Sequence, residues 1–188
     1  APDLSGPYAV AFERLHRVAR FDGPGAPETP LADLGPLISI FGGNAGAEAL
    51  AALPEGALLA ILETRGPEGA RRALRIAPDG RSETLTLPGG SDLSPVGADL
   101  APDGRLLLLE RRYLPGRGFA VALRRLALPP AAPAAETLAE FPPQSAGDNA
   151  EGIAAWRDAD GRTRVLILTD DNLSLMQRTL LWEFALPD

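Results

Sequence analysis

Residues 93–113 read LSPVGADLAPDGRLLLLERRY, and this stretch contains the signal that decides the fold. An apolar segment leads into Asp103-Gly104, and a run of leucines follows the pair. Asp-Gly between two apolar runs is a strong hairpin signal, because glycine accepts the positive φ that such a turn requires. The leucine run ends in an acidic residue, Glu110. The stretch therefore predicts two antiparallel strands with a carboxylate near the end of the second.

The same plan recurs along the chain at a spacing of about 50 residues, which is in the range of one four-stranded propeller blade. Each repeat has a short apolar run that leads to an acidic residue. The four runs are PYAVAFERLHR (7–17), ALLAILETR (57–65), RLLLLERRY (105–113) and RVLILTDDN (164–172). Turn signals before three of these runs are the pairs Glu55-Gly56, Asp103-Gly104 and Asp160-Gly161. The repetition predicts an all-β chain.

We expect a single β-propeller domain over residues 1–188, with blade-like units at about 7–43, 44–92, 93–147 and 148–188. Propellers close with about four to eight blades, and the first unit begins in its second strand at Tyr8. The chain is therefore expected to be a partial or truncated propeller. Further blades would come from a missing segment or a second copy, or the C-terminal strand would complete the first blade. A compact four-bladed ring is the alternative.

The proline-rich stretch from Pro24 to Pro36 is expected to be a loop. Proline cannot donate a hydrogen bond to a sheet ladder, so it is excluded from central strands. The chain also contains no convincing long amphipathic helix. Secondary structure is therefore expected to be strands and loops.

The composition excludes several classes of function. The net charge is −7, and all 18 basic residues are arginine. An acidic chain argues against a broad contact with a nucleic-acid backbone, and the lack of lysine excludes Schiff-base chemistry. Because there is no cysteine, disulfides, thiolate nucleophiles and thiolate metal sites are excluded as well. No apolar run approaches the roughly 20 residues needed to span a bilayer.

Acidic residues recur at matched positions of the repeat. In an antiparallel hairpin, the start of the first strand and the end of the second lie at the same end of the sheet. If the first strands line the central channel, the acids gather at one mouth of that channel. The expected metal ligands are Glu13, Glu48, Glu63, Glu110, Glu151 and Asp170. Three of them are also the expected catalytic residues, namely Glu63, Glu110 and Glu151.

A ring of like charges is unfavourable unless positive charge neutralises it. Calcium takes six to eight oxygen ligands and is the expected cofactor, with arginine side chains as the alternative source of charge. Arginines are also expected to hold an anionic small-molecule ester or phosphoester. The candidates for this role are Arg14, Arg17, Arg111 and Arg178. In the competing interpretation, the acids form structural ion pairs.

Serine-based catalysis is not expected. No G-x-S-x-G elbow occurs, and a catalytic triad would have to recruit His16, the only histidine. A lone histidine also excludes a histidine metal cluster. Its position beside Arg14 and Arg17 favours a strand-surface or phosphate-side role over that of a catalytic base.

Three segments resemble one known family. They are NAGAEALAALPEGALLAILE (44–63), LSPVGADLAPDGRLLLLERRY (93–113) and DNAEGIAAWRDADGRTRVLILTDDNLSLMQRTLLWEFAL (148–186). They resemble the phytase-like, esterase-like propeller domain of exported bacterial proteins. The resemblance implies a β-propeller, a periplasmic or secreted location, and hydrolysis of esters or phosphoesters. Calcium dependence is implied through a more distant similarity to propeller phytases. The family pattern usually begins with a glycine-rich segment and an acidic serine–aspartate strand, which this sequence lacks.

Three functional hypotheses follow. The first is an extracytoplasmic metal-dependent hydrolase of an ester or phosphoester, with its site at the channel mouth. The second is a non-catalytic propeller that binds a ligand or a protein. The third is a calcium-dependent lactonase or carboxylesterase, which shares the metal site but differs in substrate.

Overall fold

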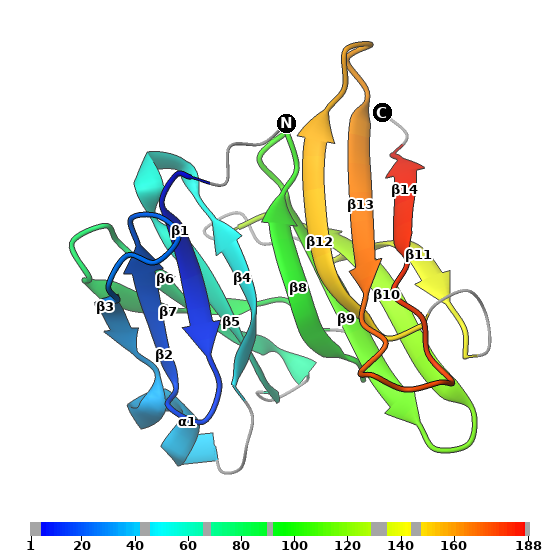
Figure 1. Cartoon of the computed structure of the whole chain (residues 1–188), viewed down its shortest axis with the longest axis horizontal. Coiled ribbons are helices and arrows are strands. Elements are labelled where there is room, and N and C mark those ends of the chain that lie inside the picture. The colour runs from blue at the N-terminus through cyan, green and yellow to red at the C-terminus, as the bar shows by residue number, and fades with distance from the viewer. Residues whose placement is uncertain are drawn as a thin grey trace.

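The computed structural model describes residues 5–41, 46–65, 69–89, 92–128, 135–143 and 148–186, and it is built of strands (Figure 1). They form four antiparallel sheets of three or four strands. The first sheet contains β1 (Tyr8–Phe12), β2 (Arg17–Phe21) and β3 (Thr29–Asp33). The second contains β4 (Ala47–Ala52), β5 (Leu58–Arg65), β6 (Arg71–Ile76) and β7 (Ser82–Leu87).

The third and fourth sheets follow the same up-and-down order. The third contains β8 (Ser94–Leu100), β9 (Leu106–Leu114), β10 (Gly118–Leu126) and β11 (Glu136–Phe141). The fourth contains β12 (Ala150–Arg157), β13 (Thr163–Thr169) and β14 (Leu181–Ala185). The described residues also include helix α1 (Gly35–Phe41) and a 3-10 turn, Pro54–Gly56. The all-β prediction is therefore confirmed.

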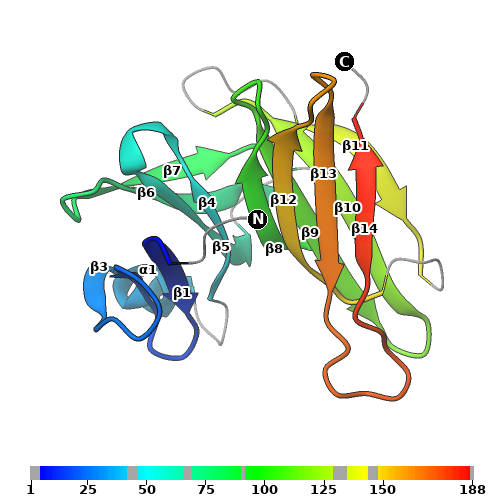
Figure 2. The same ribbon diagram turned by 45° about the horizontal axis from the view of Figure 1, so that its top comes forward.

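The sheets follow one another as the blades of a propeller do, and they form an open row. Strand β4 packs against β8, and β8 packs against β12. Figures 1 and 2 show the first and last sheets at opposite ends of this row, so the compact four-bladed ring is not formed. Strand β14 pairs with β13, so the C-terminal strand completes the last sheet and not the first. The expected partial propeller is confirmed.

The core lies between neighbouring sheets, and β9 contributes to it on both faces. Leu106 and Leu108 pack toward the second sheet, whereas Leu107 and Leu109 pack toward the fourth. Successive side chains of a strand point to opposite faces, so a strand covered on both sides reads as a continuous apolar run. Burying each of these leucines contributes about 1.5–3 kcal/mol. The run after Asp103-Gly104 thus holds three sheets together.

The predicted acid–glycine turns are present, and one predicted loop is not. Gly104 and Gly161 have φ values of +81° and +83°, which side chains other than glycine rarely adopt. The stretch from Pro24 to Pro36, expected to be a loop, contains β3. Strand β3 is an edge strand that pairs only with β2, at the edge position where proline is tolerated.

The unit boundaries expected near residues 43–44 and 147 lie outside the described residues. In the part of the chain that is described, no helix is long and apolar enough to cross a membrane.

Candidate functional site

The first strands of three sheets have a β-bulge near their start. Strands β4, β8 and β12 each shift register there by one residue, and the extra residues are Glu48, Val96 and Glu151. Such bulges re-aim a side chain and are over-represented next to active sites. Two of the three bulged residues are carboxylates that the sequence places at the channel mouth.

The bulges also fix which positions of the second strands are equivalent. Leu62, Glu110 and Thr169 pair with the residue just before each bulge. The residues that follow these three in the sequence are Glu63, Arg111 and Asp170, of which Asp170 lies just past the end of β13. Glu110 therefore corresponds to Leu62 and not to Glu63. Because neighbours on a strand point to opposite faces, Glu110 and Glu63 face different environments.

Seven side chains from all four sheets form what we call the channel cluster. They are Glu13, His16, Glu48, Glu63, Arg111, Asn149 and Glu151. Arg111 Nη1 donates hydrogen bonds to Asn149 Oδ1 and Glu151 Oε1. A Cβ on Gly46 would lie 3.3 Å from Glu13 Cγ and 3.9 Å from His16 Nδ1, so both side chains reach the start of β4.

Electrostatics within the cluster favour a protonated carboxyl at neutral pH. Burial, followed by the charge of Glu63, raises the pKa of Glu48 to about 7, although Arg111 acts in the opposite direction. Burial likewise raises the pKa of Glu63, and Arg111 again opposes the change. A carboxyl with a pKa of about 7 is half protonated at that pH. Glu48 can therefore act as either an acid or a base near pH 7.

Three polar atoms of the channel cluster are buried without a hydrogen-bond partner among the described residues. They are Glu48 Oε2, His16 Nδ1 and Asn149 Nδ2. Buried polar groups are nearly always paired in folded proteins, and exceptions call for an explanation such as a catalytic or ligand-binding role. The cluster thus contains acceptor and donor groups that a polar ligand would satisfy. His16 and Asn149 were not among the expected site residues.

Glu110, which was expected to be catalytic and to bind metal, lies outside the channel cluster. It is buried with Arg71, whose Nη2 lies 2.9 Å from Glu110 Oε1; each side chain is only 1% exposed. Arg124 Nη1 lies 3.4 Å from Glu110 Oε2. Arg71 also donates to the carbonyl oxygens of Leu93 and Gly69. These contacts give Glu110 the surroundings of a structural ion pair between the second and third sheets.

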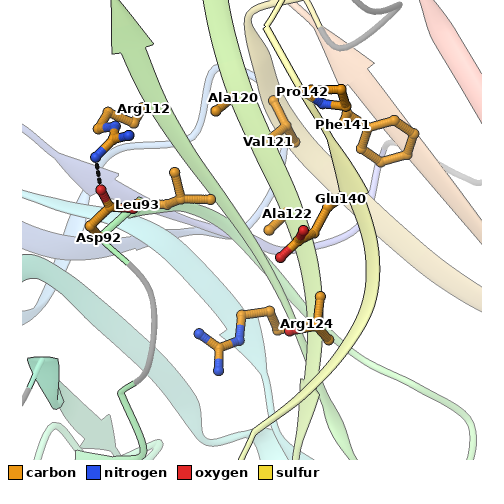
Figure 3. A pocket seen from close by; sticks show the side chains of 11 residues that line it. Asp92, Leu93, Arg112, Ala120, Val121, Ala122, Arg124, Glu140, Phe141 and Pro142 are labelled. Carbon is orange, nitrogen blue, oxygen red and sulfur yellow. Dashed lines mark ion pairs between the residues drawn. The ribbon is translucent and has the colours of Figure 1, made fainter.

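A pocket of about 510 Å³ opens beside this buried ion pair, and Figure 3 shows its lining. Arg112 and Asp92 lie on one side of it and are joined as an ion pair. Arg124 and Glu140 also line it. None of the channel cluster lines this pocket, and its two arginines both have carboxylate partners. We therefore place the candidate site at the cluster.

Two other expected residues lie at the same rim but are engaged elsewhere. Asp170 is exposed, and its Oδ1 accepts a hydrogen bond from the backbone N–H of Asn172 at 3.0 Å. Arg17 forms a two-pronged hydrogen bond with Glu28 at 2.8 and 2.7 Å and stacks 3.9 Å above the ring of Phe12.

The other three arginines that were expected to bind substrate lie in different surroundings. Arg14 is exposed in the turn after β1 with a φ of 65°. Arg178 lines a separate hollow next to the cluster, together with Arg117. Arg111 is the expected substrate-binding arginine that the structure places within the cluster.

The expected calcium ligands do not assemble as one set. Glu110 and Asp170 lie apart from the other four, as described above. Among the described residues, no three acidic or histidine side chains come close enough together to hold one metal ion. The structure therefore does not bring the six expected ligands together, and Arg111 lies among the four that do gather. Calcium binding stays a prediction from the sequence.

Comparisons with known proteins give one family and a set of solved structures. Residues 2–173 match the model of a family described as "Phytase-like: Esterase-like activity of phytase". The endo-arabinase from Bacteroides thetaiotaomicron VPI-5482 is similar over 100% of this chain and 79% of its own, at 16% identity and a TM-score of 0.57. At that identity the similarity concerns the fold alone.

A second structure, provisionally described as a gluconolactonase, aligns with 92% of this chain and 57% of its own, at 18% identity and a TM-score of 0.47. No curated protein matches the chain.

Proposed function

The chain belongs to the phytase-like family, and from this premise we propose that it hydrolyses an ester or phosphoester bond at the channel cluster. One observation carries the proposal. Glu48 is a half-buried carboxyl with an unpaired oxygen and a pKa raised to about 7, and it lies beside Glu63 and Arg111. Perturbed carboxyls of this kind gather at catalytic sites.

The two carboxyls would divide the proton transfers of hydrolysis between them. The ionised member takes a proton from water as the water oxygen attacks the ester carbon or the phosphorus. The bond to the leaving oxygen then breaks, and the protonated member gives its proton to that oxygen. The two carboxyls titrate together, so the roles belong to the pair and not to a fixed residue.

Arg111 would stabilise the negative charge that develops on the substrate oxygen. Its Nη1 is held by Asn149 and Glu151, which fixes the guanidinium in place. The Nε and Nη2 groups have no hydrogen-bond partner among the described residues and remain available to a substrate. Preorganised donors of this kind are commonly the largest single contribution to catalysis.

A panel of chromogenic substrates tests the proposal. We expect turnover of p-nitrophenyl acetate or p-nitrophenyl phosphate, and a loss of about 10²- to 10³-fold in Arg111→Gln because an oxyanion donor is removed. The control is Arg112→Gln, since Arg112 is the adjacent arginine and is paired with Asp92. A lactone in the same panel tests the lactonase alternative, which predicts hydrolysis of the lactone. No turnover of any substrate would favour a non-catalytic binding propeller.

Calcium binding is tested by thermal melting of metal-stripped protein. Because Arg111 already pairs with Glu151, and no three carboxylates of the described residues lie close enough to hold one ion, we expect calcium to change the melting temperature of the wild type little. In Arg111→Gln the same carboxylates lose their positive partner, so calcium is expected to raise the melting temperature clearly. A ligand at about 100 times its Kd stabilises by roughly 2.7 kcal/mol. A rise in the wild type that is lost in Glu48→Gln would instead support the calcium site expected from sequence.

A further inference from the structure

A second hollow, of about 590 Å³, lies next to the channel cluster. It is formed between the β9–β10 hairpin and the loop that follows β13, and Arg117 and Arg178 line it from these two segments. Tyr113 and Phe119 line this hollow and also a smaller one, of about 220 Å³, that contains Glu63 and Arg111. The two hollows therefore share an aromatic wall, and one molecule could occupy both.

This hollow is lined by two positively charged side chains, although the chain as a whole is acidic. Among the described residues, no carboxylate pairs with the guanidinium of Arg117 or Arg178. The one acid in the lining, Asp148, accepts hydrogen bonds from the backbone N–H groups of Asn149 and Arg178, each at 3.0 Å. Most arginines elsewhere are paired with acids, as Arg17, Arg71 and Arg164 illustrate. Two arginines left without acids in one hollow favour an anionic ligand.

The edge of the same hollow is apolar. Leu173, Leu175 and Met176 are 99%, 105% and 90% exposed, and Met176 lines the hollow. Leu173 has a φ of 55°, in the left-handed region that is strained for a bulky residue.

This loop is held in shape by its own hydrogen bonds. Asp171 Oδ1 accepts from Leu173 N at 2.9 Å, and Asn172 Nδ2 donates to Gln177 Oε1 at 3.0 Å. The loop therefore presents three large apolar side chains to solvent beside two arginines. Exposed apolar groups that gather in this way mark binding surfaces.

We propose that this hollow binds an anionic amphiphile, with its phosphate or carboxylate group on Arg117 and Arg178 and its apolar chain along Phe119 and Met176. Tyr113 and Phe119 separate this hollow from the smaller one that contains Glu63 and Arg111. The bond to be cleaved would lie in that smaller hollow. The inference rests on the proposed function only in treating this molecule as the substrate. Its chemical class is an ester or phosphoester that has both an apolar chain and a separate anionic group.

Calorimetric titration with decyl phosphate, kept below its micelle concentration, tests the binding directly. We expect decyl phosphate to bind at least about tenfold more tightly than inorganic phosphate, because burial of each CH₂ group adds affinity. Arg178→Gln and Arg117→Gln should each weaken binding about tenfold, as the loss of a charge-assisted hydrogen bond does. Leu175→Ser combined with Met176→Ser should weaken decyl phosphate binding while leaving inorganic phosphate unchanged.

Matched controls are Arg81→Gln, an exposed arginine in the β6–β7 turn, and Leu15→Ser, an exposed leucine in the β1–β2 turn. Neither should change the titration. Equal affinity for decyl phosphate and inorganic phosphate, or no effect of the arginine variants, would overturn the proposal. Binding to phosphatidylglycerol vesicles without binding to monomeric decyl phosphate would also overturn it, in favour of a membrane surface.

Two assays of the wild type separate this inference from the proposed function. Hydrolysis of p-nitrophenyl acetate requires the channel cluster but no anionic tail, so it tests the proposed function without the amphiphile site. If acetate ester hydrolysis is present and decyl phosphate fails to bind, the amphiphile site is wrong and the hydrolase stands. If decyl phosphate binds and no ester is hydrolysed, the site stands and the proposed activity is wrong.

Discussion

Glutamine in place of Glu48 is expected to lower the rate of ester hydrolysis by about 10²- to 10⁴-fold, the usual contribution of a general acid or base. Glutamine keeps the size of the side chain but cannot exchange a proton, so the acid–base pair with Glu63 is lost. The measurement is kcat as a function of pH with p-nitrophenyl acetate. We expect the wild type to show a titration near pH 7, which the variant lacks, because the pKa of Glu48 is raised to about 7.

The control for this variant is Glu83→Gln, which changes an exposed glutamate on β7. It should leave both the rate and the pH profile unchanged. An unaltered pH profile in Glu48→Gln would remove Glu48 from the mechanism. If the rate of hydrolysis then fell strongly in Glu63→Gln alone, the titrating group would be assigned to Glu63.

Stability gives a second readout of Glu48 that does not depend on catalysis. Its pKa is higher in the folded protein, about 7, than its ordinary value of 4.5, so the folded state binds more protons between these values. Stability should therefore fall as the pH rises from about 4.5 to about 7 and stay level above that. Because the carboxyl is partly open to water, the difference is at most about 1 kcal/mol. Glu48→Gln should flatten this dependence in urea unfolding at pH 5 and pH 8.

The largest loss of stability is expected for Glu110→Gln, about 3–5 kcal/mol in the free energy of unfolding. The substitution removes the carboxylate that lies 2.9 Å from Arg71, a cation whose side chain is 1% exposed. It also removes the partner of Arg124. Denaturant unfolding of the two proteins measures the difference. The matched control, Glu136→Gln, breaks an exposed ion pair with Arg125 and should change stability by no more than about 1 kcal/mol.

A triple variant separates loss of the ion pair from general damage to the core. Replacing the three charges together, as Arg71→Met, Glu110→Leu and Arg124→Met, should restore much of the lost stability, because no buried charge is left unpaired. Wild-type stability in Glu110→Gln together with a loss of hydrolysis would contradict the structural role. It would return Glu110 to the catalytic set expected from sequence.

The contrast between Glu110 and Glu63 shows how much the register of a strand decides. Both residues follow an apolar run, but Glu63 stands seven residues after Gly56, whereas Glu110 stands six residues after Gly104. A shift of one residue moves a side chain to the other face of its strand. Strands β4 and β8 have the same bulge, and Glu110 pairs with Pro95 as Leu62 pairs with Ala47. Arg111 takes the position of Glu63, and Glu110 faces Arg71 instead.

The gathering of acids at one rim was partly predictable. The expected gathering of Glu13, Glu48, Glu63 and Glu151 is present, because hairpin strands of successive sheets begin and end at the same rim. No local pattern marked the raised pKa of Glu48, since it depends on burial by other sheets. Burial of a carboxyl arises only after distant segments pack.

By itself, the sequence determined the all-β class, the acid–glycine turns, the number of sheets and the rim at which the acids lie. These depend on local φ preference and on apolar patterning, which are properties of short segments. The tertiary structure decided which acids join the channel cluster, which arginine lies among them, and which carboxyl has a pKa raised to about 7. Those outcomes depend on strand register and on desolvation by neighbouring sheets, and both are set by contacts between residues far apart in the chain.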